Sequence, residues 1–236
     1  MATDVRNQSI LVLIAALNEE QGIGPTIDDV KRHVPDSHIL VVDGFSKDKT
    51  VEVARELGAQ VVYRESSGKG DALAHAIANA KGNYDYVVFI DADYTYPAEF
   101  VPQMIETIKM NCRLGMVCGN RFNSLFRQEW MNKAFYVGNR LLGFTHNLLN
   151  GVSMKDPLSG LRVVRWSIVK NWKPKSRGFD IEVEMNHHVE RQGYIIQEID
   201  ISYRHRLGEK KLKVRHGFQI LERMIVEVNP QVFYSS

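Results

Sequence analysis

Short apolar runs alternate with helical patterns through the first half of this chain, and no other feature of the sequence restricts the fold as strongly. Four of the runs have the length of buried strands, at residues 10–16, 38–42, 60–63 and 86–90. Helical patterns lie between them, at 26–34, 49–57 and 69–80. Strands joined by helical crossovers form a parallel sheet. The sequence therefore predicts an α/β fold, a mostly parallel twisted sheet with helices on both faces, continued by a helix from Ala98 and by strands near 116–118 and 161–164.

Two later segments carry apolar residues at helical spacing. In the segment 133–149 the stripe consists of Ala134, Val137, Leu141, Phe144 and Leu148. We expect this stripe to pack on the core, and contact with a membrane surface is the alternative. The C-terminal segment carries Val214, Phe218, Leu221, Ile225 and Val228 on one face, opposite Arg215, Glu222 and Arg223. This pattern predicts an ordinary amphipathic helix.

Size and composition exclude several classes of protein. The chain has 236 residues, 44% of them hydrophobic, which is enough for a proper core. Its longest apolar run, Ile10 to Leu17, is far shorter than the roughly 20 residues of a membrane-spanning helix. The N-terminus lacks the pattern of a secretory signal, so we expect a cytoplasmic protein. The net charge of +2 gives no reason to expect nucleic acid as a partner.

Polar residues follow each of the first four predicted strands. They are Asn18-Glu19-Glu20, Asp43, Arg64 and Asp91-Ala92-Asp93, in the order of the strands. Ligands of open α/β sheets bind outside the carboxyl ends of the strands. We therefore expect a binding site at this edge of the sheet.

Asp91 and Asp93 stand one residue apart at the end of an apolar strand, where two carboxylates repel each other unless a cation or a proton lies between them. Oxygen ligands of this kind suit Mg²⁺ or Mn²⁺, which complete their shells with water and phosphate oxygens. In the alternative reading, one aspartate caps the following helix and the other faces solvent.

The loop Ser66-Ser67-Gly68-Lys69-Gly70-Asp71 begins a predicted helix, and its glycines allow the backbone to approach a ligand. A lysine at a helix start favours a phosphate group. The loop matches neither the Walker A nor the dinucleotide-binding pattern. The alternative is a glycine-containing loop with a solvated lysine.

A basic segment lies near the C-terminus. Between 204 and 215 it holds Arg204, Arg206, Lys210, Lys211, Lys213 and Arg215 against a single acid, Glu209. Such a segment attracts anions, although a solvated basic face would have the same composition.

Seven motifs in order over nearly the whole chain resemble those of the family 2 glycosyltransferases of the GT-A fold, and within them the dolichyl-phosphate sugar synthases. Residues 16–19 resemble the opening P-T-Y-N-E, residues 41–50 resemble V-V-D-D-x-S-x-D-x-T, and Asp91-Ala92-Asp93 stands at the metal-binding D-A-D. Downstream, the segments 119–122, 156–160, 178–184 and 204–212 resemble G-x-R-[YF], D-x-x-S-G, G-F-x-x-x-x-E and R-x-x-G-x-S-K-L.

The resemblance implies a role for each matching residue. Nucleotide-sugar binding is expected of Ala16, Asn18, Glu19, Asp43, Lys69, Gly70, Asp91 and Ala92. A Mg²⁺ or Mn²⁺ ion would be held by Asp91 and Asp93, with Thr95 at the place of a further ligand, and the acceptor phosphate by Arg204, Arg206 and Lys211. The residues expected to serve catalysis are Asp91, Asp93, Arg121, Asp156 and Glu184. We expect one GT-A domain over 1–236, with a nucleotide-sugar-binding half at 1–120 and an acceptor half at 121–236.

Two departures from the family pattern bear on specificity. Gly44 replaces the second acid of the D-D pair, so the contact with base or ribose is expected to differ. Lys210 replaces the serine of S-K-L and makes the site more basic. The Gly68-Lys69-Gly70 form resembles enzymes with UDP-linked donors, which favours UDP-glucose or UDP-N-acetylglucosamine over GDP-mannose.

The acceptor implied by the resemblance is a polyprenyl (dolichyl) phosphate, reached by peripheral contact at the cytoplasmic face of a membrane, with inversion at the anomeric carbon. Its phosphate is already an anion and needs no general base, whereas a hydroxyl acceptor would need one, for which Asp156 and Glu184 are the candidates. The alternatives are a soluble acceptor such as phosphoglycerate and a non-catalytic nucleotide-binding module.

Overall fold

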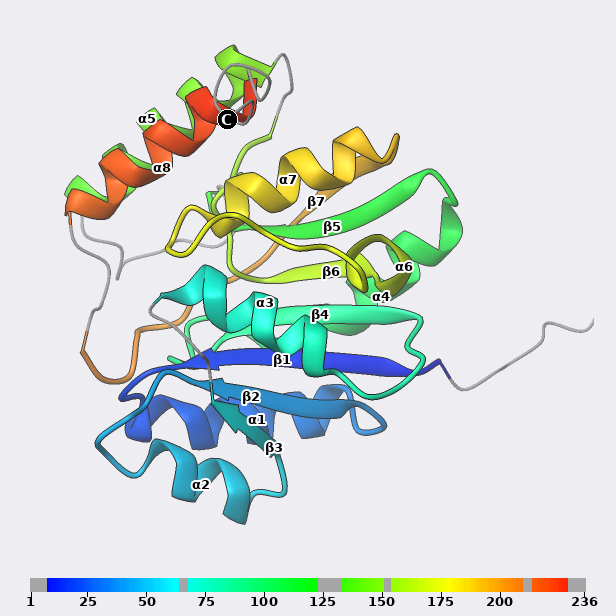
Figure 1. Ribbon diagram of the computed structural model, residues 1–236, viewed down its shortest axis with the longest axis vertical. Helices are drawn as coiled ribbons and strands as arrows, with labels where there is room; N and C mark the ends of the chain where they lie inside the picture. Colours follow the sequence, from blue (N-terminus) through cyan, green and yellow to red (C-terminus); the bar gives the residue numbers. More distant parts are fainter. Residues whose placement is uncertain (1–7, 64–67, 123–132, 151–153, 210–213, 229–236) are drawn as a thin grey trace, which may run out of the picture.

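The computed structural model describes residues 8–63, 68–122, 133–150, 154–209 and 214–228, in which seven strands form one sheet (Figure 1). The strands are β1 (Ile10–Ala16), β2 (His38–Asp43), β3 (Gln60–Tyr63), β4 (Tyr86–Asp91), β5 (Leu114–Asn120), β6 (Arg162–Arg165) and β7 (Ile195–Asp200). Their order in the sheet is β3-β2-β1-β4-β6-β5-β7. Only β6 runs antiparallel to its neighbours, β4 and β5. The predicted α/β fold with a mostly parallel sheet is confirmed.

The helices cover both faces of the sheet. They are α1 (Glu20–His33), α2 (Thr50–Glu56), α3 (Lys69–Asn79), the 3₁₀ turn η1 (Ala98–Phe100), α4 (Val101–Met110), α5 (Lys133–Asn150), α6 (Trp166–Val169), α7 (Ile181–Arg191) and α8 (Val214–Val228). Successive residues of β1 point to opposite faces, so Val12 joins a core with α1 and α4, while Leu13 joins one with α3 and α7. A strand buried on both faces has a continuous apolar sequence, as β1 does.

The helix α1 begins at Glu20, six residues before the predicted start at Thr26, so the prediction of a start after Pro25 was wrong. Its first turn is hydrogen-bonded, because the backbone N–H groups of Gly22 and Ile23 donate to the Glu19 carbonyl at 3.0 and 2.8 Å. A side chain at Gly22 would lie 2.6 Å from the Ala92 carbonyl oxygen. The first turn is therefore held close against the segment that follows β4, and the helix continues through Pro25.

Two helices lie side by side beyond α7: α5 and α8 (Figure 1). Ile220 and Met224 on the inner side of α8 form a small buried cluster with Val183 of α7, and Leu142 and Leu149 of α5 and the loop residue Leu158 pack against it. The outer side exposes large apolar side chains: Val137, Leu141, Phe144 and Leu148 of α5 and Phe218 and Ile225 of α8. We call these six residues the α5–α8 apolar face.

The prediction that the α5 stripe packs on the core was wrong, and Phe218 and Ile225 of the predicted apolar side of α8 are exposed as well. The buried residues of α8 are Ile220, Met224 and Glu227. Ion pairs fix this orientation, because Arg223 contacts Asp180 at 2.9 Å and Arg191 contacts Glu227 at 2.7 Å. Within the described residues, no helix is both long and apolar enough to cross a membrane.

Candidate active site

The register of the sheet brings the predicted strand-end residues together. Ala16 of β1 pairs with Asp43 of β2, and Ala15 pairs with Asp91 of β4. Parallel neighbouring strands in this register end at the same edge, so the residues after β1, β2 and β4 share one rim. Arg64, the polar residue predicted after β3, lies outside the described residues.

Asp43 organises the turn after β2. Its side chain is completely buried, and its two oxygens accept hydrogen bonds from the hydroxyl and the backbone N–H of Ser46, at 2.5 and 2.8 Å. The Ser46 hydroxyl accepts from the backbone N–H of Asn18 at 2.8 Å, which ties this turn to the end of β1. The expected contact of Asp43 and Asn18 with a nucleotide stays a prediction.

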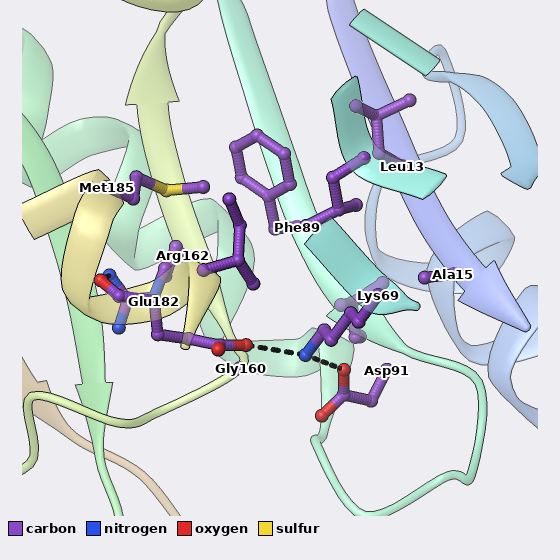
Figure 2. Close-up of a pocket in the computed structure, with 12 residues that line it drawn as sticks. Leu13, Ala15, Lys69, Phe89, Asp91, Gly160, Arg162, Glu182 and Met185 are labelled. Carbon is purple, nitrogen blue, oxygen red and sulfur yellow. Dashed lines mark hydrogen bonds and ion pairs between the residues drawn. The ribbon is translucent and has the colours of Figure 1, made fainter. Parts of the chain in front are cut away.

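Asp91 forms an ion pair with Lys69, and Figure 2 shows the lysine ammonium between two carboxylates. Lys69 Nζ lies 2.6 Å from Asp91 Oδ1 and 2.6 Å from Oε1 of Glu182, on the first turn of α7. The side chain of Asp91 is 29% exposed, whereas those of Lys69 and Glu182 are 14% and 9% exposed. The Lys69 side chain thus reaches from the start of α3 to the rim formed by the residues after β1, β2 and β4.

Asp93 has a different set of partners. Its Oδ1 accepts from the hydroxyl of Thr95 at 2.6 Å and from the Thr95 backbone N–H at 3.1 Å. Its Oδ2 is paired with the guanidinium of Arg206, which also binds the carboxylate of Glu19. Each aspartate of the Asp91-Ala92-Asp93 segment therefore has its own cation, and each cation has a second acid.

The two aspartates have opposite pKa shifts. Burial raises the pKa of Asp91, but the charge and hydrogen bond of Lys69, together with the charges of Arg121 and Arg206, outweigh burial and hold this pKa below its usual value. Burial and the charge of Asp91 raise the pKa of Asp93 above its usual value, and Arg206 offsets them only in part. A further cation near Asp93 would therefore relieve a real repulsion between the two carboxylates.

A backbone clamp fixes the start of α3. The backbone N–H of Gly70 donates to the Arg177 carbonyl at 3.1 Å, and no side chain fits at Gly68 or Gly70, because the carbonyls of Arg177 and Ser176 occupy the space. Glu184 supports the clamp, since its carboxylate accepts from the backbone N–H groups of residues 175 and 176 at 2.7 and 2.5 Å. The glycines of this loop thus serve packing against the loop before α7.

Arg121 and Asp156 form a buried pair. The guanidinium Nε and NH2 donate to the two carboxylate oxygens at 2.6 and 2.8 Å, and neither side chain is more than 4% exposed. The rings of Tyr96, Phe122 and Tyr203 lie 5.3 to 5.8 Å from the guanidinium carbon. The pair therefore anchors the loop 156–160 to the end of β5.

The basic segment reaches the site through its first half. The backbone N–H groups of Arg204 and Leu207 donate to the carbonyls of Thr95 and Asp93 at 2.9 and 3.1 Å, so this strand-like stretch crosses the Asp93 turn. The side chain of Arg204 pairs with the buried Asp29 at 2.8 Å and stacks on Tyr94. Lys210 and Lys211 lie outside the described residues.

The carboxylate oxygens at the rim are suitable ligands for Mg²⁺ or Mn²⁺ bound together with a phosphate. Within the described part of the chain, no group of three or more His, Cys, Asp or Glu side chains could hold a metal alone. Asp91 and Asp93 offer carboxylate oxygens only, which suits hard ions that take further oxygens from substrate and water. A side chain at Gly160 would lie 2.5 Å from Asp91 Oδ2, so the glycine keeps space beside that oxygen.

Sequence reasoning missed Glu182. Asp180, Glu182 and Glu184 alternate at the start of α7, where acids ordinarily stabilise the helix N-terminus. The sequence signal that could have found Glu182 is its position two residues before Glu184, which was predicted as a site residue. It is Glu182, and not Glu184, that contacts Lys69.

Comparison with known proteins assigns the chain to a family. Residues 11–172 match the model of Glycosyl transferase family 2, so the chain belongs to that family. The predicted recognition of a family 2 glycosyltransferase is confirmed, and with it the prediction of an enzyme.

Two curated relatives are informative. The chain is 30% identical over 229 residues to a dolichyl-phosphate hexose transferase of Haloferax volcanii, an alignment that covers 96% of both proteins. It is 27% identical to a dolichol-phosphate mannosyltransferase of Pyrococcus furiosus, over 91% of this chain and 62% of that one.

A solved structure confirms the GT-A fold. The glucosyl-3-phosphoglycerate synthase of Mycobacterium tuberculosis, in complex with Mn²⁺, UDP-glucose and phosphoglyceric acid, superposes with a TM-score of 0.74 at 23% identity. The match covers 94% of this chain and 80% of the synthase.

Proposed function

We propose that this glycosyltransferase moves a hexose from a nucleoside diphosphate sugar to the phosphate of a membrane-borne polyprenol, with inversion at the anomeric carbon. The observation that carries the proposal is the α5–α8 apolar face beside the loop that borders Asp91. The name of the Haloferax relative supports the same acceptor class.

The apolar face and the donor rim share a structural support. On its inner side α5 packs against the loop 156–160, and a Cβ at Gly143 would lie in ordinary contact with Pro157, 3.4 Å from its ring. The same loop ends at Gly160, beside Asp91 Oδ2. A lipid lying on the outer side of α5 would therefore have its headgroup within reach of this loop and the donor rim.

Exposure of six large apolar side chains to water is unfavourable. A contiguous exposed apolar patch ordinarily marks an interaction surface. Membrane-surface helices have this arrangement, with apolar residues on one side only. We assign the face to the surface of a membrane, on its cytoplasmic side, where the enzyme would meet both its soluble donor and its lipid acceptor.

Donor binding falls to the residues of the rim. Lys69 would bind a phosphate oxygen of the donor, while Glu19, Asn18 and the turn after Asp43 would contact the nucleoside. A divalent ion held by Asp91 and Asp93 would neutralise charge on the departing diphosphate. The cations around it provide further stabilisation of that charge.

The acceptor phosphate needs a cationic site and no base. Asp156 is bound on both oxygens to Arg121, and Glu184 accepts two backbone hydrogen bonds, so we assign both to positioning. Arg206 is the described member of the predicted acceptor set nearest the donor aspartates. An anionic acceptor with this arrangement requires no proton transfer.

Calorimetric titration of UDP and GDP, with and without Mn²⁺, tests the donor half of the proposal. We expect one of the two nucleotides to bind the wild type tightly with Mn²⁺ and only weakly without it. The variants Asp91→Asn and Asp93→Asn should bind that nucleotide at least about tenfold more weakly than the wild type when Mn²⁺ is present. Asp28→Asn, an exposed change on α1, is the control and should bind as the wild type. Nucleotide binding that is identical with and without metal in all four proteins would overturn the assignment.

A further inference from the structure

Glu182 has no role in the motif-based assignment, yet it is one of the two acids that contact Lys69. Its side chain is 9% exposed and points into the pocket shown in Figure 2, together with Asp91 and Arg162. Burying a carboxylate is costly unless it is paired. It accepts a hydrogen bond from the Lys69 ammonium, 113 residues away in sequence, at 2.6 Å.

Asp91 alone would neutralise Lys69, so the second acid requires a reason. When Asp91 gives an oxygen to a metal ion, its ion pair with Lys69 is weakened, because one carboxylate then serves two cations. A lysine ammonium left in this buried position without a partner would be strongly disfavoured. Glu182 would keep its contact with Lys69 whether or not a metal ion is bound, since it is not one of the expected metal ligands.

We propose that Glu182 is a positioning residue that holds the Lys69 ammonium in place when Asp91 gives an oxygen to the metal ion, so that Lys69 passes from Asp91 to a phosphate oxygen of the nucleotide. The inference rests on the proposed donor site. It adds a residue, and an exchange of ion-pair partners, that the motifs do not assign.

Rigid supports at both ends of the pair favour this role. Lys69 starts α3, whose first turn is clamped to the Arg177 carbonyl, and Glu182 lies on the first turn of α7 directly after that clamp. The backbone carbonyl of Glu182 also accepts from the buried guanidinium of Arg162 at 3.3 Å. The two charged groups therefore face each other from elements with a fixed separation, and only the flexible lysine side chain has to move.

A double-mutant cycle tests the inference. Glu182→Gln, Lys69→Met and the double variant are compared with the wild type by calorimetric titration of UDP and GDP, each with Mn²⁺ and with EDTA. We expect Glu182→Gln to weaken Mn²⁺-dependent binding about tenfold and binding in EDTA less than about twofold. In the Lys69→Met background, Glu182→Gln should change affinity by less than about twofold, because its partner is gone.

Glu190→Gln on the last turn of α7 is the matched control, since it removes a half-buried carboxylate of the same helix. If the losses of nucleotide affinity in the two single variants multiply in the double variant, the inference is overturned. It is also overturned if Glu182→Gln binds the nucleotide with Mn²⁺ as tightly as Glu190→Gln does. If Glu182→Gln does not fold, Glu182→Asp takes its place in the cycle with the same criterion. Absence of Mn²⁺-dependent nucleotide binding in the wild type would instead overturn the proposed function.

Discussion

His146 of α5 and His187 of α7 are buried side by side, with ring centroids 5.8 Å apart. Burial lowers the pKa of His146 to about 4, although its contact with Asn147 raises this pKa slightly, and the charge of Arg162 lowers it further. Burial and the neighbouring His146 lower the pKa of His187 to about 3. Both rings are therefore neutral in the folded enzyme at neutral pH, and they join α5 to α7 without charge.

These histidines predict an acid-sensitive fold. Because their folded-state pKa values lie below the unfolded value of about 6.5, the unfolded chain binds more protons, and stability present above pH 6.5 is lost as the pH falls toward 4 and 3. At pH 5 each ring costs about 2 kcal/mol of unfolding free energy relative to pH 7.

Urea unfolding of His187→Leu at pH 7 and pH 5 measures this contribution. The variant should lose about 2 kcal/mol less than the wild type between the two pH values. His75→Gln, which changes a partly exposed ring on α3, should lose as much as the wild type. Equal losses in all three proteins would contradict the assignment.

At the scale of single residues, the sequence predicted the rim but not its pairing. Asp91, Asp93 and Lys69 were found because each follows a strand or begins a helix at the expected edge. The Glu182–Lys69 contact was not found, since it joins residues 113 apart whose local patterns are those of a helix start. Ion pairs between distant elements leave no periodic signal in a single sequence.

The four strands with continuous apolar runs were the most predictable elements. The strands β1, β2, β3 and β4 were predicted to within one residue at each end. Continuous apolar runs of this length between turn residues are typical of β-strands. The helix α7 and the strand β7 were missed. The buried side of α7 includes Glu182, Glu184 and Asn186, whose polar groups hide its amphipathic pattern, and β7 is largely half-exposed.

Helical periodicity located α5 and α8 but could not determine which side faces the protein. An apolar stripe has the same pattern whether it packs on a core or on a lipid surface. Here the choice is made by tertiary contacts, the pairing of Arg223 with Asp180 above all. The exposed stripe that results leaves large apolar side chains of α5 and α8 in solvent.

The α5–α8 apolar face predicts reversible membrane binding. Sedimentation with vesicles of anionic phospholipid should recover the wild-type protein, and the double variant Phe144→Glu with Leu148→Glu should bind at least about tenfold more weakly. Met110→Glu, at the exposed end of α4, changes an equally apolar residue off this face and should bind as the wild type. Equal recovery of all three proteins would remove the membrane from the proposal.

For the whole molecule, the parallel half of the sheet builds the donor rim, and the segments after β5 add what surrounds it. From the second half of the chain, the loop 156–160 reaches Asp91, the stretch 201–207 reaches Asp93, and the start of α7 reaches Lys69. The same half carries the exposed apolar face. In the proposed function, a soluble donor and a lipid-borne acceptor would meet on this half of the protein.

The most direct test of this account is the fate of the transferred sugar. The enzyme is incubated with Mn²⁺, a polyprenyl phosphate in vesicles, phosphoglycerate, and radiolabelled UDP-glucose, UDP-N-acetylglucosamine or GDP-mannose in turn. We expect label from one donor to enter an organic-extractable product, and none to do so with Asp93→Asn. Label that appears only in a water-soluble product would contradict the lipid acceptor.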